Sequence, residues 1–216
     1  MTNKTILGGL LSILLVTLLW SGITPHDRFT WFLEVLPIFI VIPILAATYH
    51  RFTFTMMAYG LLAFHAVILM VGGHYTYAEV PLFNWIKVAF NLGRNDYDRL
   101  GHYVQGFVPA IIAREVLLRR SPLKPGKWLF FIVVCICLAF SATYELFEWS
   151  VAALTGTAAD SFLGTQGDPW DTQKDMATAV VGAVTALLTL TRWHDNTLTR
   201  LGYSPAEGSD VHRHVS

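Results

Sequence analysis

The chain has 216 residues, of which 54% are hydrophobic and 14% are charged, and its formal net charge is zero. A soluble domain carries roughly 25% charged residues, so this composition indicates a membrane protein about one domain long. The neutral balance gives no indication of a nucleic-acid partner, and membrane lipids are the expected partners.

Hydropathy predicts six apolar segments, each near the roughly 20 residues that a helix needs to cross a bilayer. They are 5–24, 31–49, 52–73, 98–118, 128–154 and 171–193. The segment 74–97 is too polar to cross, and its amphipathic stretch 80–93 is expected to lie in the membrane interface. We therefore predict an all-α fold with a six-helix transmembrane domain, residues 1–193, followed by a polar cytoplasmic tail, residues 194–216.

Lysine and arginine set the orientation of these helices, because cytoplasmic loops carry an excess of them. With the N-terminus inside, the cytoplasmic segments hold more lysine and arginine than the outer ones, chiefly through the loop RRSPLKPGK at 119–127. Both termini are then expected in the cytoplasm.

This orientation gathers carboxylates at the outer face, many of them at or inside the ends of apolar helices. They are Asp27, Glu34, Glu79, Asp96, Asp98, Glu145, Glu148, Asp160, Asp168, Asp171 and Asp175. His74 and His102 fall in the same layer. An acid at the bilayer centre costs roughly 2.5–3.5 kcal/mol on insertion scales, so this concentration of acids indicates a function.

Helical spacing singles out two pairs. Asp98 and His102 are four residues apart near the start of the fourth segment, so they share one helical face. Glu145 and Glu148 are three residues apart near the outer end of the fifth segment. The macrodipole disfavours acids at a helix C-terminus, so we expect a functional or ion-paired role for the two glutamates.

The sixth segment opens with a third group. Asp168, Asp171 and Asp175 follow one another at spacings of three and four, and they line one face if the helix starts early. Aspartates at a helix N-terminus are ordinary capping residues. That reading competes with a functional one for Asp98, Asp168 and Asp171, but not for Asp175, which lies one turn farther in.

We expect the fourth, fifth and sixth helices to bring the predicted catalytic residues into one pocket: Asp98, His102, Glu145, Glu148, Asp171 and Asp175. Secondary candidates are Glu34, His74, Glu79 and Asp168, whereas Asp27, Asp96 and Asp160 are expected to be solvated loop acids. Carboxylates with one imidazole suit a divalent metal ion, and the candidate metal ligands are Asp98, His102, Glu148 and Asp175. General acid–base chemistry and cation passage are alternative uses of such acids.

Four strings carry a resemblance to a known family: GGHYTYAEVPLFNW, YDRLGHYVQGF, ATYELFEW and GTQGDPWDTQKDM. Through them the chain resembles the YjdF type of bacterial inner-membrane protein over nearly the whole membrane region. That family has no assigned biochemical activity. The resemblance therefore implies a multi-pass protein of the bacterial inner membrane and supplies no substrate.

A looser resemblance is to the VanZ-like proteins. The Asp98-Arg-x-x-His102 start of one helix is similar to their Asp-Lys-x-x-His, and Glu145-x-x-Glu148 is similar to their Glu-x-x-Gln. Asp175 leads into a helix of small residues, as in that family, but the arginine of the VanZ-like pattern is absent. VanZ-like proteins are linked to glycopeptide resistance, so this resemblance implies a site at the outer face of the membrane.

Three classes of function follow from these observations. A membrane enzyme acting on an envelope lipid or lipid-linked substrate is preferred, and it predicts a cavity that opens sideways to the outer leaflet. An ion- or proton-coupled transporter requires a polar path to the cytoplasm, where only Arg114 and Glu115 interrupt the apolar inner halves and are expected to snorkel or pair locally. A structural protein would pair the acids with outer-face cations: Lys87, Arg94, Arg99 and Lys174.

Overall fold

The computed structural model describes residues 3–156, 160–204 and 209–210, and most of them are helical. The helices are α1 (Asn3–Gly22), α2 (Arg28–Thr48), α3 (Met56–Tyr75), α4 (Pro81–Ala89), α5 (Tyr97–Arg120), α6 (Lys127–Thr155), α7 (Asp160–Leu163) and α8 (Asp171–Arg200). A 3-10 turn, η1 (Tyr77–Glu79), precedes α4, and the short strands β1 (Tyr203–Ser204) and β2 (Ser209–Asp210) pair antiparallel after α8. The predicted all-helical class is confirmed.

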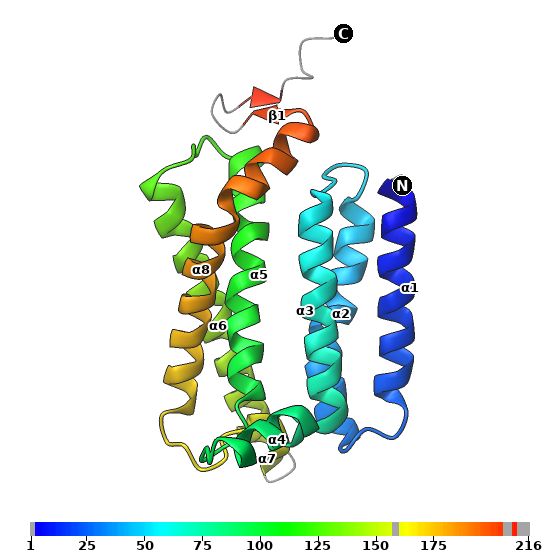
Figure 1. Ribbon diagram of the computed structural model, residues 1–216, viewed down its shortest axis with the longest axis vertical. Coiled ribbons are helices and arrows are strands. Elements are labelled where there is room, and N and C mark those ends of the chain that lie inside the picture. The colour runs from blue at the N-terminus through cyan, green and yellow to red at the C-terminus, as the bar shows by residue number, and fades with distance from the viewer. Residues whose placement is uncertain (1–2, 157–159, 205–208, 211–216) are drawn as a thin grey trace.

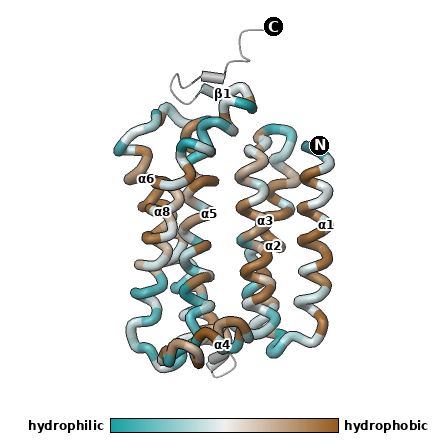
Figure 2. The backbone as a smooth tube through the Cα atoms, viewed as in Figure 1, coloured by the Kyte–Doolittle hydropathy of each residue, from teal (hydrophilic) through white to brown (hydrophobic). Residues whose placement is uncertain are grey.

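Five helices in the described part of the chain are long and apolar enough to cross a membrane: α1, α2, α3, α6 and α8. Figure 2 shows hydrophobic residues along the middle of these helices and hydrophilic residues toward their ends. α8 continues beyond the predicted end at Trp193 to Arg200. α5 is also long, at 24 residues, but it is less apolar than a membrane span typically is and falls outside this set.

The long helices lie alongside one another in two groups (Figure 1). One group is α1, α2 and α3, the other is α5, α6 and α8, and α3 contacts α5 between them. α4 and α7 lie across one end of the bundle, which we call the α4 end, and the start of α1 and the end of α8 lie at the opposite end. The starts of α5 and α8 and the last turns of α6 therefore meet at the α4 end.

α5 and α8 pack closely because each presents a glycine to the backbone of the other. A Cβ atom at Gly106 of α5 would overlap the carbonyl oxygen of Ala179, and one at Gly182 of α8 would overlap that of Tyr103. Ala179 and Ala183 are fully buried in the same seam. Small residues let membrane helices approach in this way, and the contact holds the first turns of α5 and α8 side by side.

A buried polar network joins helices at the opposite end. The carboxylate of Glu115, fully buried, accepts hydrogen bonds from the Thr55 backbone N–H at 2.9 Å and from His194 Nε2 at 3.1 Å. Arg114, also buried, donates to His194 Nδ1 at 2.9 Å and to Asp195 at 2.6 Å. Glu115 also pairs locally with Arg119, at 2.8 Å, as expected. The other contacts of Arg114 and Glu115 reach farther than expected, because they tie α5 to the start of α3 and to α8.

α4 exposes an apolar side at its end of the bundle. The side chains of Leu82, Trp85 and Val88 are exposed, whereas Phe83 packs against Tyr97 with ring centroids 5.2 Å apart. An exposed apolar face on a short amphipathic helix suits the interfacial position expected for this segment.

The glycine seam gives a testable prediction. Replacing Gly106 or Gly182 with alanine should lower the free energy of unfolding by about 1–3 kcal/mol, because the backbones of α5 and α8 must separate. Gly60→Ala is the matched control, since nothing lies within 4 Å of a Cβ there; it should be neutral or stabilise by up to about 1 kcal/mol. Unfolding in detergent measures all three, and equal effects at all three positions would contradict close packing of the seam.

Candidate functional site

All six predicted catalytic residues are buried at the α4 end. α5 supplies Asp98 and His102, α6 supplies Glu145 and Glu148, and α8 supplies Asp171 and Asp175. Their side chains are brought together because α5 and α8 start here and α6 ends here. The structure thus places the residues that helical spacing selected around one region of the bundle.

Arg94, which lies just before α5, binds two of the aspartates. Its guanidinium donates to Asp171 and to Asp98, the second at 3.2 Å, and its Nη2 also reaches the carbonyl oxygen of Gly164 at 3.4 Å. Burial acts to lower the pKa of Arg94, but the hydrogen bond and charge of Asp171 and the charge of Asp98 outweigh it, so the pKa is raised. Arg94 stays charged and joins the start of α5 to the start of α8.

Arg99, in the first turn of α5, binds the α8 side of the cluster. It donates to Asp175, to Asp171 at 2.7 Å and to Asp168 at 3.3 Å. Lys174 also donates to Asp168, at 2.6 Å, and this bond is the main cause of the lowered pKa of that carboxyl group. Asp168, a secondary candidate, therefore lies on the rim of the site as a paired carboxylate.

Helix capping explains none of the three aspartates for which it was considered. Asp168 Oδ1 accepts a hydrogen bond from the Trp170 backbone N–H at 3.0 Å. α5 and α8 have no side-chain cap at their N-termini, and Asp98 and Asp171 bind arginines instead.

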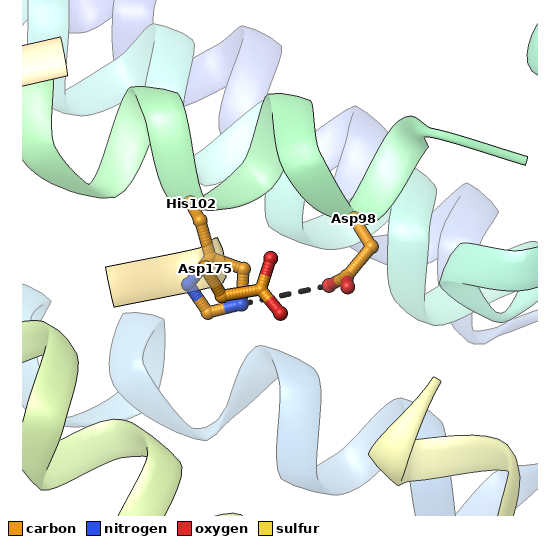
Figure 3. A group of neighbouring side chains, drawn as sticks. All are labelled: Asp98, His102 and Asp175. Atoms are coloured by element: carbon orange, nitrogen blue, oxygen red, sulfur yellow. Dashed lines mark ion pairs between the residues drawn. The ribbon is translucent and has the colours of Figure 1, made fainter. Parts of the chain in front are cut away.

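His102 lies next to Asp98 of α5 and Asp175 of α8 (Figure 3), and next to Glu145 of α6. Its Nε2 lies 3.5 Å from Asp98 Oδ1 and 3.5 Å from Glu145 Oε1, while its Nδ1 lies 2.9 Å from Gln105 Oε1. Asp98, His102 and Asp175 each offer one ligand atom, and these atoms lie within 4.8 Å of one another. Three of the four candidate metal ligands therefore form a group, and the neighbour next to His102 is Glu145 instead of the expected Glu148.

Glu34 of α2 joins the cluster from the other helix group. It is 4% exposed, and its Oε2 accepts a hydrogen bond from the Tyr144 hydroxyl at 3.1 Å. Its carboxyl group interacts electrostatically with Asp98 and His102. This secondary candidate thus belongs with the six buried residues.

The other two secondary candidates lie apart from the cluster. The Nδ1 of His74 is 3.0 Å from the Ser21 carbonyl oxygen, and its ring packs on Trp20 at 4.5 Å between centroids. Glu79 is exposed and accepts a hydrogen bond from Asn84 Nδ2 at 3.1 Å. Each contact has a local structural role.

The three acids expected to be solvated loop residues differ in their surroundings. Asp27 caps α2 by accepting from the Thr30 backbone N–H at 2.6 Å. The side chain of Asp96 is 40% exposed and lies 3.7 Å from Arg94 Nε. The side chain of Asp160 lies outside the described part of the chain.

A groove of about 720 Å³ lies beside the cluster, between α6, α8 and the loop before α8. Glu145 and Asp171 form part of its polar lining, and Leu146, Trp149 and Met176 form part of its apolar lining. Leu146 and Trp149 are 62% and 66% exposed on the outside of the bundle. The groove therefore connects buried carboxylates with a surface of apolar side chains.

The charges divide the cluster into two parts. Lysine and arginine pair with the aspartates, whereas Glu34, Glu145 and Glu148 have no lysine or arginine partner within the described residues. Carboxyl groups in such different surroundings can serve as proton donors and acceptors. The aspartates are held in place, and the glutamates and His102 remain for proton transfer or ligand binding.

The sequence indicates Arg94 and Arg99 only as possible ion-pair partners of the acids in a structural protein, and it does not indicate Tyr144. Each of the three contacts at least one of the predicted acids. Arg94 precedes Asp98 by four residues and the two form an ion pair, a spacing that can be read from the sequence. Arg99 pairs with residues far along the chain, and no sequence spacing indicates those contacts.

The chain is similar to known membrane proteins over most of its length. The family described as "Predicted membrane protein (DUF2238)" matches residues 6–196. The protein named inner membrane protein YjdF, from Escherichia coli (strain K12), is 49% identical over 189 residues, which cover 88% of this chain and 90% of that protein. No solved structure matches the chain. The resemblance to the YjdF type is confirmed, and the chain belongs to this family of integral membrane proteins, named DUF2238.

Proposed function

We propose that this protein crosses the inner membrane six times and binds or modifies an envelope lipid or lipid-linked substrate at its extracytoplasmic face. α5 is the sixth span, and the α4 end faces outward. The residues that act on the substrate are the buried carboxylates and His102, and the substrate enters through the groove between α6 and α8.

The distribution of basic residues supports this topology. Arg119 and Arg120 end α5 at the same end of the bundle as the start of α1 and the end of α8. The loop that follows carries further basic residues, Lys124 and Lys127. Because lysine and arginine concentrate in cytoplasmic loops, this end is cytoplasmic, and α5 crosses with its polar first turns shielded by α6 and α8.

The groove is the observation that carries the proposal. Its apolar residues Leu146 and Trp149 lie on the exposed side of α6, where acyl chains would contact them. Its polar residues Glu145 and Asp171 belong to the cluster. A lipid can therefore keep its chains in the outer leaflet while its head group reaches the buried carboxylates, without leaving the bilayer.

The arrangement around His102 suits acid–base chemistry on such a head group. The imidazole lies between Asp98 and Glu145, at 3.5 Å from each, and Glu145 also lines the groove. Glu145 is thus the carboxylate placed to touch the substrate and to exchange a proton with it, and His102 lies beside Glu145. Arg94 and Arg99 hold the aspartates that surround this pair.

The transport alternative has less support. A polar path would have to link the cluster with the buried network around Glu115 at the opposite end. Between them, Gly106 and Gly182 bring the backbones of α5 and α8 into contact, which leaves no room for a path along that seam.

A structural function is the second candidate, because Arg94, just before α5, and Arg99, on α5, already pair with aspartates of α8. In that case the ion pairs hold the bundle together and the groove has no ligand. Quantifying the lipids bound to the protein distinguishes a structural function from lipid binding.

The proposed topology predicts the outcome of reporter fusions. Alkaline phosphatase fused after Gly93, in the loop before α5, should be active because that loop faces the periplasm. Green fluorescent protein fused after Ser216 should fluoresce because the C-terminus lies in the cytoplasm. An inactive phosphatase at Gly93 together with a dark C-terminal fusion would reverse the orientation and contradict the proposal.

Lipid binding predicts selective enrichment of one lipid class. The full chain, extracted from membranes into polymer nanodiscs, should carry that class in excess over the bulk membrane when its lipids are quantified by mass spectrometry. Ala142→Trp should fill the groove that Ala142 lines and lower the enrichment about tenfold, equivalent to roughly 1.4 kcal/mol.

Ala153→Trp is the matched control, because Ala153 is exposed on the same helix and does not line the groove. It should retain the enriched lipid. A lipid composition equal to that of the bulk membrane in all three proteins would overturn lipid binding and favour the structural function.

A further inference from the structure

We propose that the candidate site binds one divalent transition-metal ion, with ligands from Asp98, His102, Glu145 and Asp175. The inference rests on the proposed function in that it assigns a cofactor to the same site. The four residues come from α5, α6 and α8, so the ion would join the three helices whose ends form the site.

The spacing of the ligand atoms is the first argument. His102 Nε2 lies 3.5 Å from both Asp98 Oδ1 and Glu145 Oε1, beyond the roughly 2.7–3.2 Å of an N–H···O hydrogen bond. Two ligands bound at about 2.0–2.2 Å to one tetrahedral ion lie about 3.3–3.6 Å apart. Each of these two pairs is therefore spaced as two ligands of one ion. Asp98, His102 and Asp175 also each offer one ligand atom, and these three atoms lie within 4.8 Å of one another (Figure 3).

The Oε1 atom of Glu145 is the second and independent argument. Glu145 is 7% exposed, and this oxygen is buried with no hydrogen-bond partner within the described residues. Leaving a buried charged oxygen without a partner is costly, and buried charges are normally paired or coordinate metals. This oxygen points toward His102 Nε2, where a cation would satisfy both atoms.

Gln105 fixes the form of the imidazole that a metal requires. Its amide oxygen lies 2.9 Å from His102 Nδ1, and because this oxygen only accepts hydrogen bonds, Nδ1 carries the proton. In the metal-bound form Nε2 would carry no proton and would present its lone pair to the ion. Metal-binding histidines typically donate their other N–H to an oxygen in this way, so Gln105 acts as a positioning residue.

The arginines leave ligand atoms free. Arg94 binds Oδ2 of Asp98, and Arg99 binds Oδ1 of Asp175, so each aspartate keeps one oxygen that no arginine holds. Three carboxylate oxygens and one imidazole nitrogen suit Zn²⁺ or Mn²⁺ better than Ca²⁺, which prefers oxygen ligands alone. An ion of this kind would present a Lewis acid beside the groove.

The experiment uses the full chain with a tag that contains no histidine, stripped with EDTA and then titrated with Zn²⁺, Mn²⁺, Mg²⁺ or Ca²⁺. Elemental analysis after desalting should find about one Zn²⁺ or Mn²⁺ per chain, and that ion should raise the unfolding temperature. Less than about a tenth of an ion per chain, with no rise for any of the four ions, would overturn the proposal.

Variants then locate the ion. His102→Gln should abolish stoichiometric binding, and Gln105→Leu should weaken it by about 10–100-fold. His74→Gln is the matched control, because His74 lies outside the cluster; it should bind as the unchanged protein does. The histidines of the C-terminal tail remain in every variant, so equal binding by all of them would place the ion elsewhere and overturn the site.

The lipid experiment, repeated on stripped and on loaded protein, separates the two proposals. Lipid enrichment with no bound ion would refute the metal site and leave the proposed function standing. Stoichiometric ion binding with bulk lipid composition would refute the proposed function and leave the metal site standing.

Discussion

The binding of α8 aspartates by α5 arginines is the interaction on which the rest of this structure depends. Six carboxylates are buried at the α4 end: Glu34, Asp98, Glu145, Glu148, Asp171 and Asp175. Buried acids this close repel one another unless cations or protons compensate them. Arg94 and Arg99 supply that compensation for the aspartates. Because both arginines lie on or beside α5 and most of their partners on α8, neutralising the charge also fixes the two helices together.

The buried carboxylates at the two ends of the bundle differ in their hydrogen-bond partners. At the opposite end, the carboxylate of Glu115 accepts hydrogen bonds from Thr55, His194 and Arg119, and the pocket that Arg114 lines there has a volume of about 190 Å³. At the α4 end, Glu145 keeps an oxygen without a partner and lines the groove. A satisfied network stabilises packing, whereas an unsatisfied buried group beside a cavity is typical of a functional site. This contrast supports a functional site at the α4 end of the bundle.

Much of the fold and of the candidate site could be predicted because both follow from local patterns. Apolar length gives the long helices, and spacings of three and four place Asp98 with His102 and Glu145 with Glu148. The remainder depends on contacts between distant segments. Arg99 contacts Asp171 and Asp175 only when α5 and α8 are packed together. Glu34 belongs to α2, in the other helix group, and no local pattern indicates its place in the cluster. Glu115 and His194, far apart in sequence, form a buried pair that hydropathy alone reads as two unrelated polar residues.

The central claim is that Arg99 and the aspartates of α8 act as one coupled unit. A double-mutant cycle on Arg99→Gln and Asp171→Asn tests it directly, because their side chains meet at 2.7 Å and Asp171 is outside the proposed metal ligands. Unfolding of the metal-free protein should show each single variant destabilised and the double variant less so than their sum, with a coupling free energy of about 1 kcal/mol or more. Additive effects would contradict the account.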